Sequence, residues 1–246
     1  MKKNDNIFIY TISDFKNKAS ECIEMAFQPF LNKKKENISL SVIANKYPDK
    51  PVDQRIKIII DSDTNASSYI GFLKYSEKVP EGYDYYLYID SDILLFGDEE
   101  ELINQKYDYT IVQEDWVKMS HEWHCYKHRT EEEFEKMQSL NGINAGTFGF
   151  KDVTFLKFVR DLYRKEVTDN LIRNAMLEQS SLNYAICKKL DFNLKNAFRL
   201  TDKACFFAQD KKFEKNKILY HFNGFSNQME SKYQMMKNFL NNKSRA

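Results

Sequence analysis

Two aspartates near the end of an apolar run have the spacing that a divalent cation needs. Residues 85–96 read YYLYIDSDILLF, an aromatic and β-branched stretch that predicts a buried strand, and Asp90 and Asp92 interrupt it. Carboxylates are rarely buried without a partner, because the loss of their water is costly. Alternate side chains of an extended chain point the same way, so both carboxylates can face one ion. Their oxygens suit hard cations such as Mg²⁺ and Mn²⁺.

A strand that ends in a turn is the plainer interpretation of the same residues, since Asp is common in turns. The apolar run Ile93 to Phe96 follows at once, however, and such a run is not typical of a solvated turn. The pattern therefore favours a metal site.

Strands and helices alternate through the first half of the chain. Hydrophobic patterns predict helices after Asp14 and over residues 66–75, and strands over residues 7–12, 38–43, 55–60 and 85–89. This order is typical of a mostly parallel sheet covered by helices, which binds ligands at the carboxyl ends of its strands. Asp90 and Asp92 lie at such an end, as do Tyr10-Thr11 and Asp61-Ser62-Asp63.

The second half of the chain is less regular. We expect strands over residues 109–113, 143–150 and 218–222, and helices over residues 153–165, 181–189 and 229–241. Residues 114–140 between them are polar and rich in histidine. There is no internal repeat or long linker, so the sequence predicts a single domain over residues 1–246.

The composition excludes several classes of protein. The formal net charge of +1 gives no reason to expect a nucleic-acid partner. No run approaches the ~20 apolar residues that span a bilayer, and the N-terminal residues lack the features of a signal peptide. The cysteines are far apart, so we expect reduced thiols in a cytoplasmic protein.

Three further segments accompany the Asp-x-Asp strand in chain order. They are NGINAGTFGF at residues 141–150, EQSSLN at residues 178–183 and HFNG at residues 221–224. Together with strand-Asp-x-Asp they resemble the GT-A glycosyltransferases over about residues 7–233. The last segment is similar to the His-x-x-Gly metal ligand of glycosyltransferase family 8 and its relatives. Position 178 departs from the family pattern, because it carries Glu where Asp is usual.

The resemblance implies an α/β GT-A (nucleotide-diphospho-sugar transferase) fold with a Rossmann-like, mostly parallel sheet flanked by helices. It divides the chain into a nucleotide-binding half over residues 1–113 and an acceptor-binding half over residues 114–246. The implied reaction is metal-dependent transfer of a hexose from a nucleotide sugar, with UDP-hexose favoured, to a hydroxyl of a glycan or glycolipid. Similarity to family 8 implies retention of anomeric configuration.

The resemblance also assigns the site residues. Asp90, Asp92 and His221 would bind the metal, and the imidazole favours Mn²⁺ over Mg²⁺. Glu178, Gln179 and Asn144 would lie near the reacting sugar. The nucleotide sugar would be bound by Tyr10, Thr11, Asp61, Asp63, Lys74, Ser91, Gly224 and Lys232. Among these, Gly224 allows close backbone approach and Lys232 can neutralise a phosphate.

Each of these residues also has a plain structural interpretation. His221 would also suit a hydrogen-bonded position in the core, and Lys74 and Lys232 would also suit the surface. Glu178 would also suit the start of a solvated helix. Asn144 to Gly146 would also suit a simple β-bulge.

Two other functions remain open at this point. A sugar nucleotidyltransferase would normally carry a glycine-rich loop after the first strand, and residues 10–15, YTISDF, contain no glycine. A non-catalytic carbohydrate-binding protein on the same fold would not require intact Asp90, Asp92 and His221.

Two segments carry hypotheses of their own. His121, His124, Cys125 and His128 would share one face of a helix and form a zinc site. The same region is equally an acceptor-facing loop that offers Trp116 and Trp123 to a sugar, or a plain surface insertion. The C-terminal helix carries Lys and Met residues together with Phe239 and Leu240, and either packs on the domain or makes peripheral contact with the inner face of the membrane.

Overall fold

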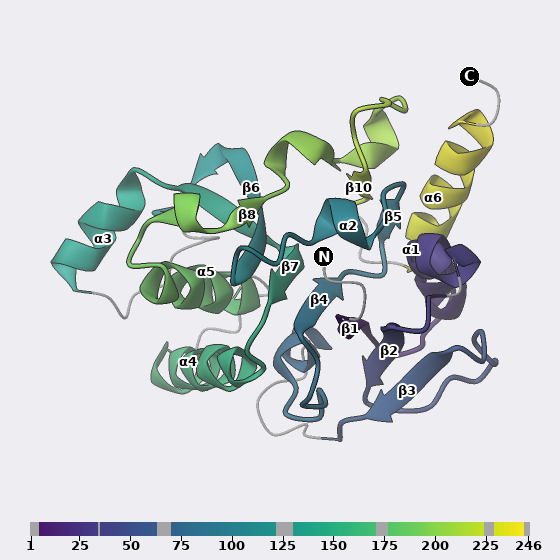
Figure 1. Cartoon of the computed structure of the whole chain (residues 1–246), viewed down its shortest axis with the longest axis horizontal. Coiled ribbons are helices and arrows are strands. Elements are labelled where there is room, and N and C mark those ends of the chain that lie inside the picture. The colour runs from purple at the N-terminus through teal and green to yellow at the C-terminus, as the bar shows by residue number, and fades with distance from the viewer. Residues whose placement is uncertain are drawn as a thin grey trace.

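The computed structural model of the chain describes residues 5–33, 35–62, 70–121, 130–170, 177–223 and 229–243. Within these residues a seven-stranded sheet forms the centre of the molecule, in the order β3-β2-β1-β4-β7-β6-β8 (Figure 1). Its strands are β1 (Ile7–Ser13), β2 (Ile38–Ala44), β3 (Ile56–Ile60), β4 (Tyr85–Ile89), β6 (Tyr109–Lys118), β7 (Asn141–Phe150) and β8 (Phe198–Arg199).

The sheet is mostly parallel, as predicted. Strands β3, β2, β1 and β4 run parallel to one another, and β8 runs parallel to β6. Strand β7 is antiparallel to both β4 and β6. The carboxyl ends of β1 and β4 therefore meet at one edge of the sheet, and this edge is where Asp90 follows β4.

Apolar residues on both faces of the strands explain why helices cover the sheet on both sides. The even-numbered residues Phe8, Tyr10 and Tyr88 pack with α4 (Thr154–Asn170) and α5 (Leu177–Lys189). The odd-numbered residues Ile7, Ile9 and Leu87 pack with α1 (Ala19–Lys33). Figure 1 shows α4 beside α5 on one side of the sheet. The shorter helices are α2 (Glu99–Leu102) and α3 (Glu131–Gln138).

A second, smaller sheet brings the C-terminal part of the chain to the same edge. Strand β10 (Leu219–His221) lies between β5 (Ile93–Leu95) and β9 (Ala204–Phe206), antiparallel to the first and parallel to the second. In this register His221 lies opposite Ile93, the residue after Asp92. The sequence predicted the last strand but not its pairing with the residues that follow the aspartates.

Helix α6 (Met229–Lys243) packs on the protein beside α1 (Figure 1). Its Met236 and Phe239 are buried in a cluster with Leu94, Tyr220 and Phe222. This arrangement favours the packed interpretation of the C-terminal helix. No helix in the described ranges is long and apolar enough to cross a membrane.

Some boundaries differ from the prediction. The segment expected as a helix over residues 66–75 is a 3₁₀-helix, η1 (Ile70–Tyr75), and its first residues lie outside the described ranges. Strand β6 continues to Lys118, because Glu114 and Lys118 still pair with Gly142 and Asn141 of β7. Helix α5 begins before Ser181, since Ser180, Ser181 and Asn183 are buried polar residues rather than an exposed face.

Candidate active site

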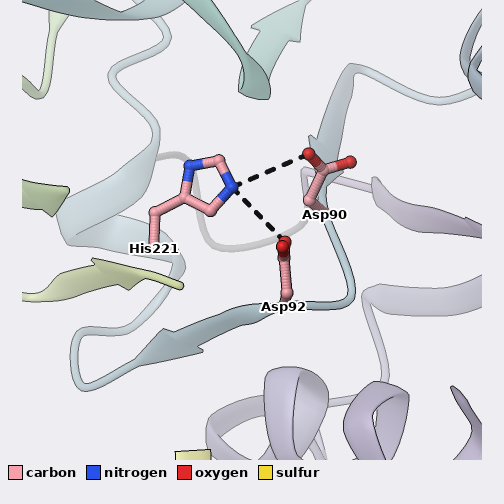
Figure 2. Close-up of side chains that lie close together, drawn as sticks. All are labelled: Asp90, Asp92 and His221. Atoms are coloured by element: carbon pink, nitrogen blue, oxygen red, sulfur yellow. Dashed lines mark ion pairs between the residues drawn. The ribbon is translucent and has the colours of Figure 1, made fainter. Parts of the chain in front are cut away.

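Asp90, Asp92 and His221 converge at the carboxyl-terminal edge of the sheet (Figure 2). Nε2 of His221 lies 3.3 Å from Oδ1 of Asp92 and 3.9 Å from Oδ2 of Asp90. One ligand atom of each residue lies within 4.8 Å of the others. The backbone amide of Phe222 donates to the carbonyl of Asp92 at 3.0 Å, so the pairing of β10 with β5 sets this geometry.

The three side chains fit a divalent cation. An octahedral ion with ligands at about 2.1 Å separates neighbouring ligand atoms by about 3 Å and opposite ones by about 4 Å. The separations of 3.3 and 3.9 Å from His221 lie in this interval. Two carboxylates with one imidazole suit Mn²⁺ or Mg²⁺. Asp92 and His221 are each 5% exposed, so little competing water reaches them.

Gly146 of β7 leaves the space in which these side chains meet. A Cβ atom at this position would lie 2.6 Å from Cε1 of His221 and 3.0 Å from Oδ2 of Asp90. Its carbonyl accepts a hydrogen bond of 2.7 Å from the amide of Asp90, so the backbone cannot move away freely. The site therefore requires glycine at position 146, and the Asn-Ala-Gly segment is not merely a bulge.

Gly146→Ala is expected to weaken Mn²⁺ binding at least ~10-fold, because the new methyl group displaces a ligand, and overpacking typically costs about 1–3 kcal/mol. Calorimetric titration with MnCl₂ measures this effect. Gly149→Ala is the matched control, since its Cβ would lie 2.7 Å from Cε1 of Tyr85, in the same strand but in the core. Equal loss of metal affinity in both variants would contradict the prediction.

One buried and one partly buried lysine neutralise the aspartates. Lys232 of α6 forms an ion pair and hydrogen bond with Oδ2 of Asp92. Nζ of Lys74, in η1, lies 3.2 Å from Oδ1 of Asp90 and 3.9 Å from Oε1 of Glu178. The side chains of Lys74 and Lys232 are 7% and 16% exposed, so the interpretation of both as surface lysines is wrong.

These contacts keep Asp92 and Lys232 ionised at neutral pH. Burial by itself raises the pKa of Asp92, but Lys232 and His221 outweigh burial and hold that pKa well below its usual range. Burial likewise lowers the pKa of Lys232, and the carboxylate of Asp92 reverses the shift and raises it. Asp92 thus remains a carboxylate throughout the neutral and mildly acidic range.

The Asn-Ala-Gly strand and the start of α5 dock onto each other through polar side chains. Oε1 of Gln179 accepts from the amide of Ala145 at 3.0 Å, and Nζ of Lys74 donates to the carbonyl of the same residue at 3.2 Å. Asn183 bonds both the amide and the carbonyl of Ile143. These bonds fix Glu178 and Gln179, both about 95% buried, at the wall of the site.

Glu114 and Tyr88 belong to the site, although the sequence did not single them out. Oε1 of Glu114 accepts from Nδ2 of Asn144 at 2.5 Å, and the hydroxyl of Tyr88 donates to Oδ1 of Asp90. The signal for Glu114 was its spacing from Trp116, because residues two apart in a strand share one face, but the sequence-based prediction ended β6 too early.

A cavity of about 910 Å³ contains the cluster. From the predicted site residues its walls include Lys74, Asp90, Ser91, Asp92, Asn144, Glu178, Gln179, His221 and Lys232. Asp14, Lys16 and Asn17 of the loop after β1 also line the cavity, which the sequence did not predict.

Some predicted site residues do not line this cavity. Tyr10 and Thr11 are fully buried, and the hydroxyl of Tyr10 donates to the carbonyl of Lys74 at 2.8 Å. Asp61, 3% exposed, accepts a hydrogen bond from Ser76 and lies 3.9 Å from Nη1 of Arg160. Their positions support a structural role rather than direct contact with a nucleotide. Asp63 and Gly224 lie outside the described residues.

The zinc hypothesis concerns a segment that is mostly outside the described ranges. Of its members, His121 is described, whereas His124, Cys125 and His128 are not, nor is Trp123. The hypothesis therefore stays a prediction.

Comparison with known proteins identifies the fold. The sequence matches no protein-family model and no curated protein. The structure is similar to the apo form of the glycosyltransferase GlyE of Streptococcus pneumoniae TIGR4, with a TM-score of 0.56 and 16% identity. That match covers 97% of this chain and 63% of GlyE. A second GlyE structure gives a TM-score of 0.56 and 15% identity, with the same coverage.

A glycosyltransferase involved in glycosylating the major capsid of PBCV-1 is similar as well, with a TM-score of 0.55 and 11% identity over 94% of this chain and 99% of that protein. The chain thus has a glycosyltransferase fold, as predicted. It spans less than two thirds of the length of GlyE, and these likenesses do not single out family 8.

Proposed function

We propose that the protein is a metal-dependent glycosyltransferase that moves a hexose from a nucleotide sugar to an acceptor hydroxyl. The observation that carries the proposal is the convergence of Asp90, Asp92 and His221 in a cavity at the carboxyl-terminal edge of the sheet. Ligands of open α/β sheets bind at this edge. The cavity of about 910 Å³ lies at the upper end of the range for small-ligand sites.

A bound divalent cation would neutralise charge that develops on the leaving diphosphate. Asp90, Asp92 and His221 would hold it. Lys232, beside Asp92, lies where it can pair with a phosphate once the carboxylate has another partner. Lys74 is fixed between Asp90 and Glu178, and so ties the metal side of the cavity to the side of Glu178.

The polar wall of Asn144, Glu114, Glu178 and Gln179 suits the hydroxyls of a hexose. Carboxylate and amide groups accept and donate hydrogen bonds in fixed directions there, because their neighbours in β7 and α5 hold them. We favour a UDP-linked donor, a glycan or glycolipid acceptor and retention of configuration, in keeping with the resemblance to family 8. The loop after β1 has no glycine, which disfavours a nucleotidyltransferase.

A thermal-shift and calorimetry screen tests the donor class and the metal together. UDP, GDP, CMP and their sugars are each added with MnCl₂ or with EDTA. One nucleotide is expected to raise Tm only with Mn²⁺. At a nucleotide concentration of 100 times Kd, binding stabilises the folded protein by about 2.7 kcal/mol, which raises Tm by roughly 5–10 °C. His221→Ala is expected to lose the shift. If no nucleotide shifts Tm with or without metal, the proposal fails.

A further inference from the structure

Two exposed aromatic rings stand together at the rim of the cavity. In the described part of the chain the exposed large apolar side chains are Tyr47, Trp116, Phe134 and Phe207. Trp116 and Phe207 are neighbours, with ring centroids 6.0 Å apart, and both line the cavity that contains Asp90 and Asp92. Exposed apolar residues are ordinary when single, but a contiguous pair at a site indicates binding.

The pair continues toward the metal ligands. The ring of Phe206 meets Trp116 edge-on at 4.8 Å, and the same ring lies 6.1 Å from the imidazole of His221. Trp116 comes from β6, whereas Phe206 is the last residue of β9 and Phe207 follows it. Elements that are distant in sequence thus build one row of rings, which ends beside the candidate metal.

Phe207 is held in a strained backbone conformation. Its φ of 51° and ψ of 46° are left-handed, which costs a bulky residue conformational energy. The backbone amide of Phe207 donates a hydrogen bond of 2.8 Å to Oδ1 of Asn223. Asn223 lies two residues after His221. Such strain persists only where surrounding structure imposes it, and it is often found at ligand sites. Phe207 is 37% exposed and lines the cavity.

Trp116 belongs to a strand on the other side of β4 from β1. The loop after β1 is therefore free to contact the nucleotide. In the sheet, β4 with the aspartates stands between β1 and the strands β7 and β6. Asp14, Lys16 and Asn17 follow β1, whereas Glu114 and Trp116 belong to β6 and Asn144 to β7, and all of them line the cavity. An acceptor that approaches over Trp116 would therefore reach the sugar end of the donor.

We propose that Trp116 and Phe207 form the acceptor subsite, and that the acceptor is a carbohydrate whose pyranose ring stacks on them; this inference rests on the proposed function. One face of a pyranose presents C–H groups, which the negative face of an aromatic ring attracts. Its rim of hydroxyls would meet Glu114 and Asn223, which line the same cavity. An acyl chain could form no hydrogen bond with these polar groups.

Transfer of the hexose to the acceptor requires no reactant besides the nucleotide sugar and the acceptor hydroxyl. An acceptor hydroxyl oxygen forms the new bond to the anomeric carbon as the bond from that carbon to the diphosphate oxygen breaks. The bonding electron pair leaves with the diphosphate, which also takes the hydroxyl proton.

A glycan array probed with the full chain, UDP and MnCl₂ tests the subsite. We expect retention on a subset of glycans, and quenching of Trp116 fluorescence by the same glycan in a Trp123→Phe background. Trp116→Ala and Phe207→Gly are expected to raise its Kd at least 10-fold. The glycine suits the left-handed backbone of position 207, so this variant should fold. Tyr47→Ala is the control, because Tyr47 is 69% exposed and lies outside the cavity lining.

The inference is overturned if no glycan is retained, if Trp116→Ala binds the glycan as well as the parent chain, or if phospholipid vesicles alone bind through these rings. Calorimetry with UDP and MnCl₂ on the same samples separates the two proposals. Nucleotide binding without any glycan binding sinks the subsite and leaves the proposed function intact. Glycan binding through Trp116 without any nucleotide binding sinks the proposed function and leaves a carbohydrate-binding site.

Discussion

Asp92→Asn is expected to lower the affinity for Mn²⁺ by more than about 100-fold, because even the loss of an outer partner of a metal ligand typically costs 10–100-fold. The amide has nearly the shape of the carboxylate but no charge. Lys232 also loses its charged partner, so the free energy of unfolding should fall by about 1–3 kcal/mol. Calorimetric titration with MnCl₂ and UDP measures the first effect, and thermal melting measures the second.

Asp108→Asn makes the same chemical change on the surface, where the side chain of Asp108 is 71% exposed beside Lys151. We expect it to bind Mn²⁺ as the parent chain does. An Asp92→Asn variant that kept full affinity for Mn²⁺ would remove Asp92 from the set of metal ligands, and the metal centre with it.

The second large effect is on stability. Asp61→Ala is expected to destabilise the fold by about 3 kcal/mol, because it leaves the buried guanidinium of Arg160 without one of its carboxylate partners. In a chain of this length that is a loss of roughly 6–12 °C in Tm. Since Asp61 does not line the cavity, the Kd for nucleotide should stay unchanged. Thermal melting and nucleotide calorimetry on the same sample measure both quantities.

Asp49→Ala serves as the comparison, because the side chain of Asp49 is 86% exposed and its substitution should change stability by less than about 0.5 kcal/mol. The opposite pattern in Asp61→Ala, an unchanged Tm with weakened nucleotide binding, would return Asp61 to the role that the sequence suggested.

The aspartate pair could be predicted because its signal is local. A buried strand followed by Asp-x-Asp can be recognised within a dozen residues, and the mostly parallel sheet follows from the alternation of strands and helices. The resemblance supplied His221, which no local pattern connects to Asp92. The structure makes that connection through the pairing of β10 with β5.

The sequence analysis assigned Lys74 and Lys232 to the site, but their ion pairs with the aspartates could not be predicted in the same way. Lys232 is 140 positions from Asp92 and Lys74 is 16 positions from Asp90, and each looks like an ordinary polar residue of its own helix. For Tyr10 the sequence predicted contact with the nucleotide, and the structure does not place the side chain in the cavity. Its strand ends at the correct edge of the sheet, but its side chain points into the core that α4 and α5 cover. The position of a residue at the end of a strand predicts that its backbone lies near the site. Whether its side chain reaches the site depends on the face of the sheet to which that side chain points.

The charges around the cavity have a consequence for the order of binding. Among the described residues its lining carries the carboxylates of Asp14, Asp90, Asp92, Glu114 and Glu178 against the ammonium groups of Lys16, Lys74 and Lys232. With five formal negative charges and three positive ones, the metal-free cavity has a formal charge of −2 when His221 is neutral. Such a field attracts a divalent cation and repels a diphosphate. A nucleotide would therefore enter after the cation, or together with it as its complex.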